Sequence, residues 1–318
     1  MSLRDGAETI INQCLDVREG EKVLVLNDSN DKDLIDSLME VLEDRGLEHE
    51  LIVYEEVDSY GGEPPEHVAD AMKNFDVVIA PTMKSLSHTE ARKDANKAGA
   101  RVATLPTVSK EIWNTSLQAD YERVKEITEK VYSLLEQASE IRVTTPSGTD
   151  LSFEVDIDTY DRDTGILNEP GNFGNLPAGE PNGYPDKISG TLVIDHFPFS
   201  PKAEKVEIRN GEVVALESEG TESSKLEEAF EEHPCTKKIA EFGFGTNPEA
   251  TLIGNPLQDE KVLGTVHFAF GDNCSYIDEG DERRNPCAIH WDSVCENPTV
   301  YFDDRKILEK GEPVFLEE

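Results

Sequence analysis

The sequence has few basic residues. Lys and Arg together number 30 in a chain of 318 residues, whereas Asp and Glu number 67, which gives a formal net charge of −37. A protein of this charge repels nucleic acids and anionic membranes, so neither is an expected partner. The acidic residues are spread over both halves of the chain instead of forming a tail. This distribution is typical of a solvated surface and indicates a halophilic organism, in which high internal salt screens the self-repulsion.

The sequence also lacks long hydrophobic segments. No run comes near the roughly 18 consecutive apolar residues that a membrane-spanning helix needs. The first residues, Met-Ser-Leu-Arg-Asp-Gly-Ala-Glu, contain neither a basic region nor the apolar core of a signal peptide. We therefore expect a soluble, cytoplasmic protein.

Cysteine is scarce as well. The chain has five cysteines, an odd number, and they form no Cys-x-x-Cys motif. A disulfide framework is therefore not expected, and most of these residues are predicted to be free and packed in the core. They are Cys14, Cys235, Cys274, Cys287 and Cys295.

The first part of the chain alternates between short apolar segments and amphipathic ones. The apolar segments lie at residues 22–26, 49–54, 76–80 and 101–105, and the helical patterns lie near 31–45, 65–73 and 88–98. Such alternation predicts a parallel sheet covered by helices. The loop after the first strand lacks Gly-x-Gly-x-x-Gly, so nucleotide binding is not supported, and Ser29 or Asp31 is expected to cap the next helix.

The pattern changes after a charged helix near residues 118–138. Beyond it, turn signals at 146–148 and 209–211 predict hairpins, and residues 161–189, rich in Gly, Pro and Asn, predict one long loop. A chain with 37% hydrophobic residues is long enough for two domains. We predict an α/β fold, with an N-terminal parallel-sheet α/β domain (1–138) and a strand-rich α+β metal-binding domain (139–318).

Two histidines and an aspartate indicate a metal site in the second domain. His290 and Asp292 are two residues apart in a strand-like segment, so both side chains point to the same face. His267 lies in the middle of another such segment, where a buried polar ring needs a partner. By itself, His267 is more often a core histidine that bonds to backbone, and His-x-Asp occurs by chance.

Two glutamates strengthen this interpretation. Glu180 ends a turn-rich segment, and Glu241 lies among apolar and glycine residues. Each alone could be a loop cap or an ordinary ion-paired residue. Together with the histidines and the aspartate, however, they point to a shared divalent cation, because one cation offsets the burial cost of all five side chains. The sequence therefore predicts a metalloenzyme whose ligands are Glu180, Glu241, His267, His290 and Asp292.

Several strings resemble the thermophilic aminopeptidase family, also called aminopeptidase T or S. They are Ser85-Leu-Ser-His-Thr-Glu-Ala-Arg92, Gly99-Ala-Arg-Val-Ala-Thr-Leu-Pro106, Asn175-Leu-Pro-Ala-Gly-Glu180, Leu263-Gly-Thr-Val-His-Phe-Ala-Phe-Gly-Asp-Asn273 and Ile289-His-Trp-Asp292. The resemblance implies a pair of metal ions held by two Glu, two His, one Asp and one Tyr. It places the glutamates at Glu180 and Glu241, the first His at His267, and the His-x-Asp pair at His290 and Asp292.

One ligand of that family is replaced in this chain. The position of the family's metal-binding Tyr is Cys274, with Tyr276, Asp272 and Asn273 as nearby substitutes. The segment between the two histidines is short. The chain thus resembles a compact, divergent branch labelled leucyl aminopeptidase. A related branch contains a dihydroxypyridine dioxygenase with one non-haem iron held by two His and one Asp, for which His267, His290 and Asp292 would suffice.

Three functions follow from these observations. The first is a metallo-aminopeptidase, a hydrolase that releases N-terminal residues from peptides. Zinc, cobalt or manganese would activate the attacking water, and Glu180 or Glu241 would act as general acid and base. The second is a non-haem iron dioxygenase, and the third is a non-catalytic ligand-binding protein. The expected partners are a peptide or small-molecule substrate and, as a homodimer, a second copy of the chain.

Overall fold

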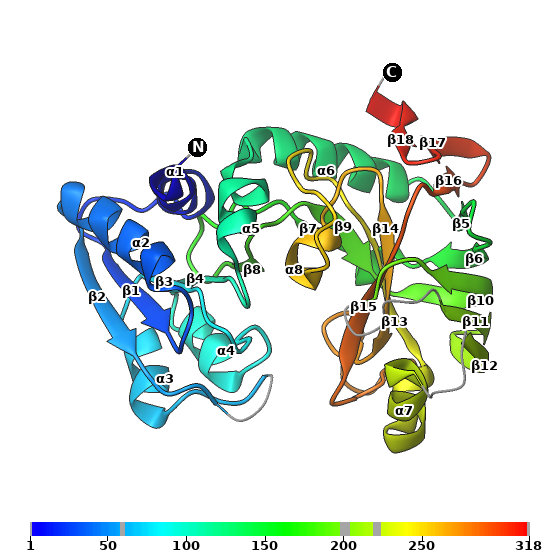
Figure 1. The fold of residues 1–318 in the computed structure, drawn as a ribbon, viewed down its shortest axis with the longest axis horizontal. Coiled ribbons are helices and arrows are strands. Elements are labelled where there is room, and N and C mark those ends of the chain that lie inside the picture. The colour runs from blue at the N-terminus through cyan, green and yellow to red at the C-terminus, as the bar shows by residue number, and fades with distance from the viewer. Residues whose placement is uncertain (1, 58–60, 198–203, 219–223, 317–318) are drawn as a thin grey trace. The chain divides into compact units, whose positions relative to one another are not determined.

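The computed structural model describes residues 2–57, 61–197, 204–218 and 224–316. The chain forms two compact units (Figure 1). The first comprises residues 1–125, 164–178 and 248–251, and the second comprises 126–163, 179–247 and 252–318. Among the described residues, no helix combines the length and apolar character that crossing a membrane requires.

The first unit is built on a parallel sheet with the strand order β2-β1-β3-β4-β8. Its strands are β1 (Lys22–Asn27), β2 (Glu48–Val53), β3 (Val77–Ala80), β4 (Arg101–Thr104) and β8 (Phe173–Asn175). Its helical segments are α1 (Leu3–Glu8), η1 (Thr9–Cys14), α2 (Lys32–Asp44), α3 (Glu66–Met72), α4 (Glu90–Lys97), α5 (Lys110–Asn114) and η2 (Ser116–Gln118). The border with the second unit falls within α6 (Tyr121–Leu135).

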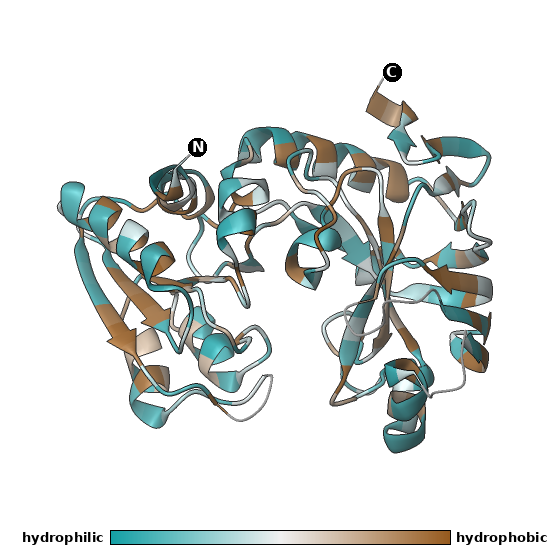
Figure 2. Cartoon of the chain, viewed as in Figure 1, coloured by the Kyte–Doolittle hydropathy of each residue, from teal (hydrophilic) through white to brown (hydrophobic). Residues whose placement is uncertain are grey.

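Local sequence explains these elements, as α2 illustrates. The carboxylate of Asp31 caps the helix by accepting a hydrogen bond from the backbone N–H of Asp33. Leu34, Leu38 and Val41 recur at helical spacing and are buried. The helix ends before Gly46, which has a positive φ of 65°. Figure 2 shows the resulting mixture of hydrophilic and hydrophobic residues along α2 and a largely hydrophobic β1.

The second unit contains two antiparallel sheets. The larger has the order β12-β11-β10-β6-β5-β16-β17-β18, and the smaller has the order β15-β14-β13-β9-β7. The larger sheet comprises β5 (Glu140–Thr144), β6 (Asp150–Val155), β10 (Pro185–Ile194), β11 (Glu204–Arg209), β12 (Glu212–Ser218), β16 (Thr299–Phe302), β17 (Arg305–Glu309) and β18 (Glu312–Pro313). The smaller comprises β7 (Asp161–Asp163), β9 (Glu180–Gly183), β13 (Ile239–Phe244), β14 (Val266–Gly271) and β15 (His290–Cys295). The helical segments are η3 (Ile157–Thr159), α7 (Lys225–Glu232), η4 (Pro234–Lys237), α8 (Pro256–Asp259) and η5 (Val314–Leu316).

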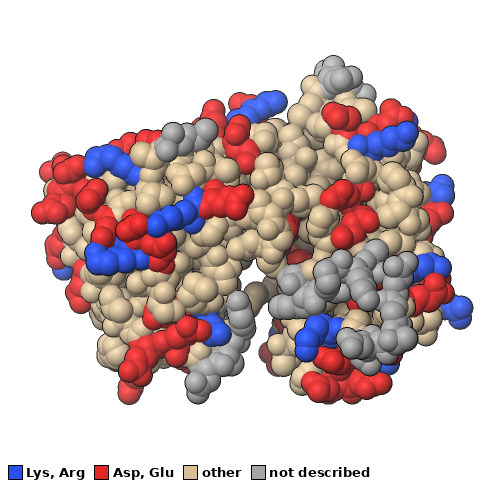
Figure 3. All heavy atoms as spheres, viewed as in Figure 1, with Lys and Arg blue, Asp and Glu red and all other residues tan. Residues whose placement is uncertain are grey.

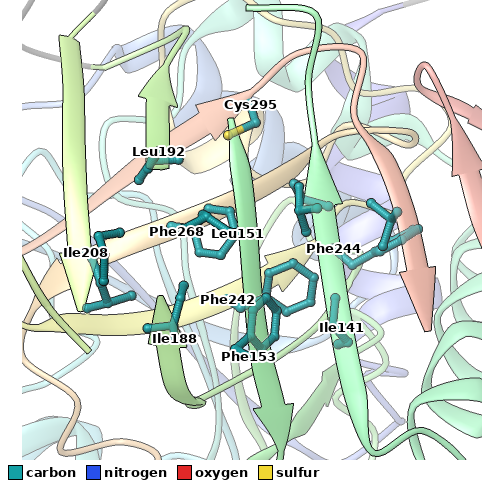
Figure 4. Close-up of a cluster of buried hydrophobic side chains, with 14 of the residues drawn as sticks. Ile141, Leu151, Phe153, Ile188, Leu192, Ile208, Phe242, Phe244, Phe268 and Cys295 are labelled. Carbon is teal, nitrogen blue, oxygen red and sulfur yellow. The ribbon is translucent and has the colours of Figure 1, made fainter. Parts of the chain in front are cut away.

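Aromatic residues join the two sheets of the second unit. Phe153 of β6 lies 4.8 Å from Phe242 of β13 and 6.1 Å from Phe268 of β14, measured between ring centroids. Figure 4 shows these rings surrounded by aliphatic side chains such as Leu151 and Ile188. One face of the smaller sheet is therefore buried in the core, and its other face is available for polar side chains.

The predicted fold class is confirmed: an N-terminal parallel-sheet part precedes a strand-rich part with antiparallel sheets. The domain border after residue 138 stays a prediction. Two other expectations are wrong. Residues 161–189 are not one loop, since they contain the short strands β7, β8 and β9 and the start of β10. Moreover, Cys235 and Cys287 form a disulfide, although no disulfide framework was expected. The other three cysteines, Cys14, Cys274 and Cys295, keep their thiols, as predicted for most of the five.

Candidate metal centre

The outer face of the smaller sheet carries the polar residues predicted from the sequence. In β13 and β14, Phe242 and Phe268 point into the core, so their neighbours Glu241 and His267 point to the opposite face. Asp292 of β15 pairs with Ala269 of β14, which also pairs with Glu241. Glu241 and Asp292 therefore flank a small residue on one face of the sheet, and the alanine leaves space between them.

An irregularity in β13 sets the direction of Glu241. The pairing with β14 shifts between Ile239 and Glu241. In a regular strand, two residues separated by one share a face, but here Ile239 belongs to the hydrophobic core while Glu241 lies on the polar side. The shift thus reorients the strand just before its functional carboxylate.

Four side chains converge at the centre of this face. The Nε2 atom of His267 lies 3.4 Å from Oε1 of Glu241, and Nε2 of His290 lies 3.0 Å from Oε2 of the same carboxylate. His290 Nε2 is also 3.6 Å from Oδ1 of Asp292. Glu241 therefore bridges two imidazoles, and both rings direct Nε2 towards the carboxylates.

Both imidazoles are held in place by their surroundings. Nδ1 of His290 lies 2.7 Å from the carbonyl oxygen of Asp272, which leaves Nε2 with its lone pair free for a metal ion. The side-chain carboxylate of Asp272 accepts a hydrogen bond from the backbone N–H of Cys287, one half of the disulfide. His267 lies against Gly243, where a Cβ atom would overlap Cε1 and Nε2 of the ring. Only glycine fits there.

A buried lysine extends the polar cluster. The ammonium of Lys261 lies 2.5 Å from Oε1 of Glu180, 2.7 Å from Oε1 of Glu260 and 3.9 Å from Oδ2 of Asp163. Asn182 donates hydrogen bonds to Glu180 and Glu241, at 3.2 and 2.9 Å. Sequence reasoning missed Lys261, Glu260 and Asn182. The signal that could have found Asn182 is its spacing of two from Glu180 in one strand.

The cluster favours positive charge. Burial lowers the pKa of the His267 imidazole, but the carboxylates of Glu180 and Glu241 outweigh burial and raise it to about 9. Burial raises the pKa of Glu180 to about 7 and that of Glu260 to about 8. Burial would also raise the pKa of Glu241, yet the two neighbouring imidazoles hold it well below its usual range. A cation beside these groups would relieve the cost of burying several carboxylates together.

The donor set fits a divalent metal ion. Within the described part of the chain, Oε2 of Glu180 and Nδ1 of His267 are buried without a hydrogen-bond partner. Three groups of side chains have ligand atoms within 4.8 Å of one another: Glu180, Glu241 and His267; Glu241, His290 and Asp292; and Glu260, His267 and Asp292. All five residues predicted as ligands belong to these groups. Their role as ligands stays a prediction.

The structure also shows which residue near Cys274 belongs to the polar cluster. Cys274 is half-buried, and its backbone N–H donates to the Asp272 carboxylate at 3.3 Å. The hydroxyl of Tyr276 instead accepts a hydrogen bond from Asn182 at 3.1 Å. Burial, together with the charge of Glu241, raises the pKa of this phenol well above its usual value. Of the substitutes considered, Tyr276 is therefore part of the polar cluster.

Comparisons with known proteins identify the family. The model of the 2,5-dihydroxypyridine 5,6-dioxygenase family matches residues 5–315, and this chain belongs to that family. A 2,5-dihydroxypyridine 5,6-dioxygenase of Pseudomonas putida is 26% identical over 270 residues, which cover 78% of this chain and 73% of the relative.

Solved structures share the fold. The structure of the dihydroxypyridine dioxygenase from Pseudomonas putida KT2440 has a TM-score of 0.80 and 21% identity, and the match covers 98% of this chain and 96% of that one. Wild-type AmpT from Thermus thermophilus has a TM-score of 0.72 and 16% identity, with 98% of each chain covered.

These findings correct the functional expectation. Membership of the thermophilic aminopeptidase family is wrong, and so are the hydrolase, aminopeptidase and protease functions derived from it, because the family model and the curated relative are dioxygenases. Zinc, cobalt and manganese gain no support from these relatives. The family match therefore indicates that the chain is an enzyme. The resemblance misled because the aminopeptidase and the dioxygenase share one fold.

Proposed function

We propose that this chain is a dioxygenase that uses one non-haem iron ion and acts on 2,5-dihydroxypyridine or a closely related hydroxylated pyridine. The observation that carries this proposal is the family match, which extends over residues 5–315 and therefore includes every residue of the polar cluster. The site chemistry supports it. Two imidazoles and one carboxylate are the usual ligands of non-haem iron in oxygenases.

We assign the iron to His267, His290 and Asp292. Asp292 shares one metal-capable group with His267 and another with His290, so its carboxylate lies within reach of both imidazoles. The Asp272 carbonyl fixes the orientation of His290, and Gly243 leaves room for the ring of His267. When bound, ferrous iron supplies the redox chemistry that allows O₂ to react with an aromatic ring.

Glu241 is the residue best placed to move a proton. Its carboxylate lies 3.4 Å from Nε2 of His267 and 3.0 Å from Nε2 of His290, directly beside the proposed iron ligands. Asn182 donates to Oε1 and fixes the orientation of the group. Glu180, the other predicted acid and base, is engaged by Lys261 at 2.5 Å. We therefore assign the removal of a proton from a ring hydroxyl to Glu241.

The test measures oxygen consumption. Protein treated with a chelator is reloaded with ferrous iron without air and is then mixed with 2,5-dihydroxypyridine and O₂. We expect substrate and O₂ to disappear in equal amounts, and no turnover with zinc, which has no redox chemistry. Asp292→Asn should abolish O₂ uptake, whereas Asp303→Asn, in the turn between β16 and β17, should not change it. Substrate loss without O₂ uptake would contradict the proposal.

A further inference from the structure

We propose that the ammonium of Lys261 neutralises two carboxylates of the cluster, Glu180 and Glu260, and so limits the centre to one divalent metal ion per chain. This inference rests on the proposed function, since it concerns the same metal centre. It makes Lys261 a positioning residue that determines metal stoichiometry.

Lys261 occupies the interior of the cluster. Its side chain is 3% exposed, and its ammonium contacts the carboxylates of Glu180 and Glu260, whose side chains are 4% and 12% exposed. An ammonium without water around it needs such acceptors, and carboxylates this deeply buried need a cation. The three charges are therefore satisfied together, in the place where a metal ion would otherwise be needed.

The lysine divides the metal-capable groups. Glu180 belongs to one group and Glu260 to another, and both carboxylates are engaged by Lys261. The remaining group, Glu241, His290 and Asp292, includes neither of these two residues. It contains two of the three proposed iron ligands, and the third, His267, lies beside it, with Nε2 3.4 Å from Oε1 of Glu241. A divalent ion at this last group would bind ligand atoms of Glu241, His290 and Asp292, which the Lys261 ammonium does not contact. A second divalent ion, placed near Glu180 or Glu260, would meet a fixed positive charge at close range in a poorly solvated site.

The backbone keeps the ammonium at this position. Lys261 follows α8, and its N–H donates to the carbonyl of Gln258 at 2.9 Å. Its own carbonyl accepts from the N–H of Asn247, also at 2.9 Å. Gly245 lies so close to this segment that a Cβ there would be 2.9 Å from the carbonyl carbon of Lys261. These contacts fix the main chain at Lys261. If its side chain moved away, two buried carboxylates would lose their counter-charge.

The experiment counts bound metal directly. Full-length protein is freed of metal with a chelator, titrated with Mn²⁺, desalted and analysed for metal per chain, with the Mn²⁺ spin-resonance spectrum as a second readout. Lys261→Met keeps the aliphatic side chain and removes the charge. Lys261→Gln also removes the charge, but its amide can still donate to a carboxylate. Lys187→Met is the control, since Lys187 pairs with Glu154 on the surface.

We expect about one Mn²⁺ per chain in the wild type and the control, and about two in both Lys261 variants, because two carboxylates lose their cation. The spectrum should change from that of an isolated ion to that of a coupled pair. If Lys261→Met is insoluble without metal, Lys261→Gln provides the same measurement.

Two results would overturn the inference. One is a folded Lys261 variant that still binds a single ion with the wild-type spectrum, and the other is a wild type that already binds a pair. Neither result decides whether the chain is a dioxygenase, because iron-dependent O₂ uptake is measured separately. Conversely, a wild type that binds one Mn²⁺ but does not consume O₂ with iron and the pyridine contradicts the proposed function and not the role of Lys261.

Discussion

Both compact units bury charged side chains, but they satisfy them differently. In the first unit, the guanidinium of Arg101 donates to both oxygens of Glu21 at 2.8 and 2.7 Å. The carboxylate of Asp28 accepts from the backbone N–H groups of Met83 and Lys84. In the second unit, by contrast, the charges form a cluster: the ammonium of Lys261 contacts two carboxylates, and the carboxylate of Glu241 lies between two imidazoles.

This difference separates structural charges from functional ones. A paired charge such as Arg101 is neutralised within its own unit and contributes to stability. A cluster that brings several buried carboxylates together costs stability, and it persists where a ligand completes it. Metal affinity should therefore depend on the second unit, whereas the charge pairs of the first unit should affect folding alone.

The largest effect is expected from the histidines of the centre. His267→Ala or His290→Ala should lower metal affinity by more than about 100-fold, since loss of a residue that merely supports a ligand already costs 10- to 100-fold. Elemental analysis after desalting measures the metal content, and circular dichroism should show an unchanged fold. His49→Ala, on β2 of the first unit, is the matched control. Full metal content in both centre variants would refute the assignment.

Breaking the charge pair of the first unit should change stability without changing metal content. Glu21→Gln leaves the guanidinium of Arg101, only 3% exposed, without its counter-charge. We expect a loss of about 3 kcal/mol in the free energy of unfolding, the lower end for a buried pair because Glu21 is partly exposed. Urea unfolding measures this loss. A change in bound metal would contradict the separation between the units.

The same pair predicts a pH dependence. Burial raises the pKa of Glu21, but its hydrogen bonds with Arg101 and the backbone of Arg18 outweigh burial and lower the pKa overall. The pair therefore contributes fully above the usual pKa of a glutamate, about 4.3, and its contribution disappears as the pH falls through the lower value of the folded state. Between neutral and acidic pH, the wild type should lose more stability than Glu21→Gln. Parallel curves would contradict this expectation.

A glycine of the second unit provides a smaller and sharper test. Gly243→Ala should displace the His267 ring, because the new Cβ would overlap it. We expect metal affinity to fall about 10-fold, since the ligand moves but is not removed. Gly46→Ala is the control. It lies in a turn with φ of 65° and open space around it, so it should cost about 1 kcal/mol of stability and leave metal binding unchanged.

The smallest effect concerns the acidic residues, which are spread over both units. Figure 3 shows Asp and Glu side chains distributed over the visible face, in agreement with the net charge of −37. Monovalent salt screens exposed charges, so the melting temperature should rise by a few degrees, roughly 5 °C, from dilute to molar KCl. Calorimetry measures it. A melting temperature that stays constant over this range would argue against a high-salt origin.

Much of the first unit follows from the sequence. The segment 22–26 became β1, the pattern at 31–45 became α2, and Asp31 caps that helix. Hydrophobic periodicity and capping act over a few residues, so they can be interpreted locally. The segment 161–189 was misinterpreted because β8, three residues long, is stabilised by pairing with β4, and no local pattern encodes that pairing.

Within the site, the sequence identified candidates but not their arrangement. His290 and Asp292 could be placed on one face from their spacing alone. The direction of the Glu241 side chain depends on a register shift between β13 and β14. The space for the His267 ring depends on Gly243 in the neighbouring strand. The disulfide between Cys235 and Cys287 likewise joins positions 52 residues apart.

The sequence by itself determined the α/β class, the acidic surface and the residue types that can bind a metal ion, because composition and periodicity express these properties directly. Only the tertiary structure decided how the buried charges are divided, with Lys261 beside Glu180 and with Glu241 between two imidazoles. The physical reason is that the energy of a buried charge depends on the atoms within a few ångströms of it, and strand pairing brings those atoms from distant parts of the chain.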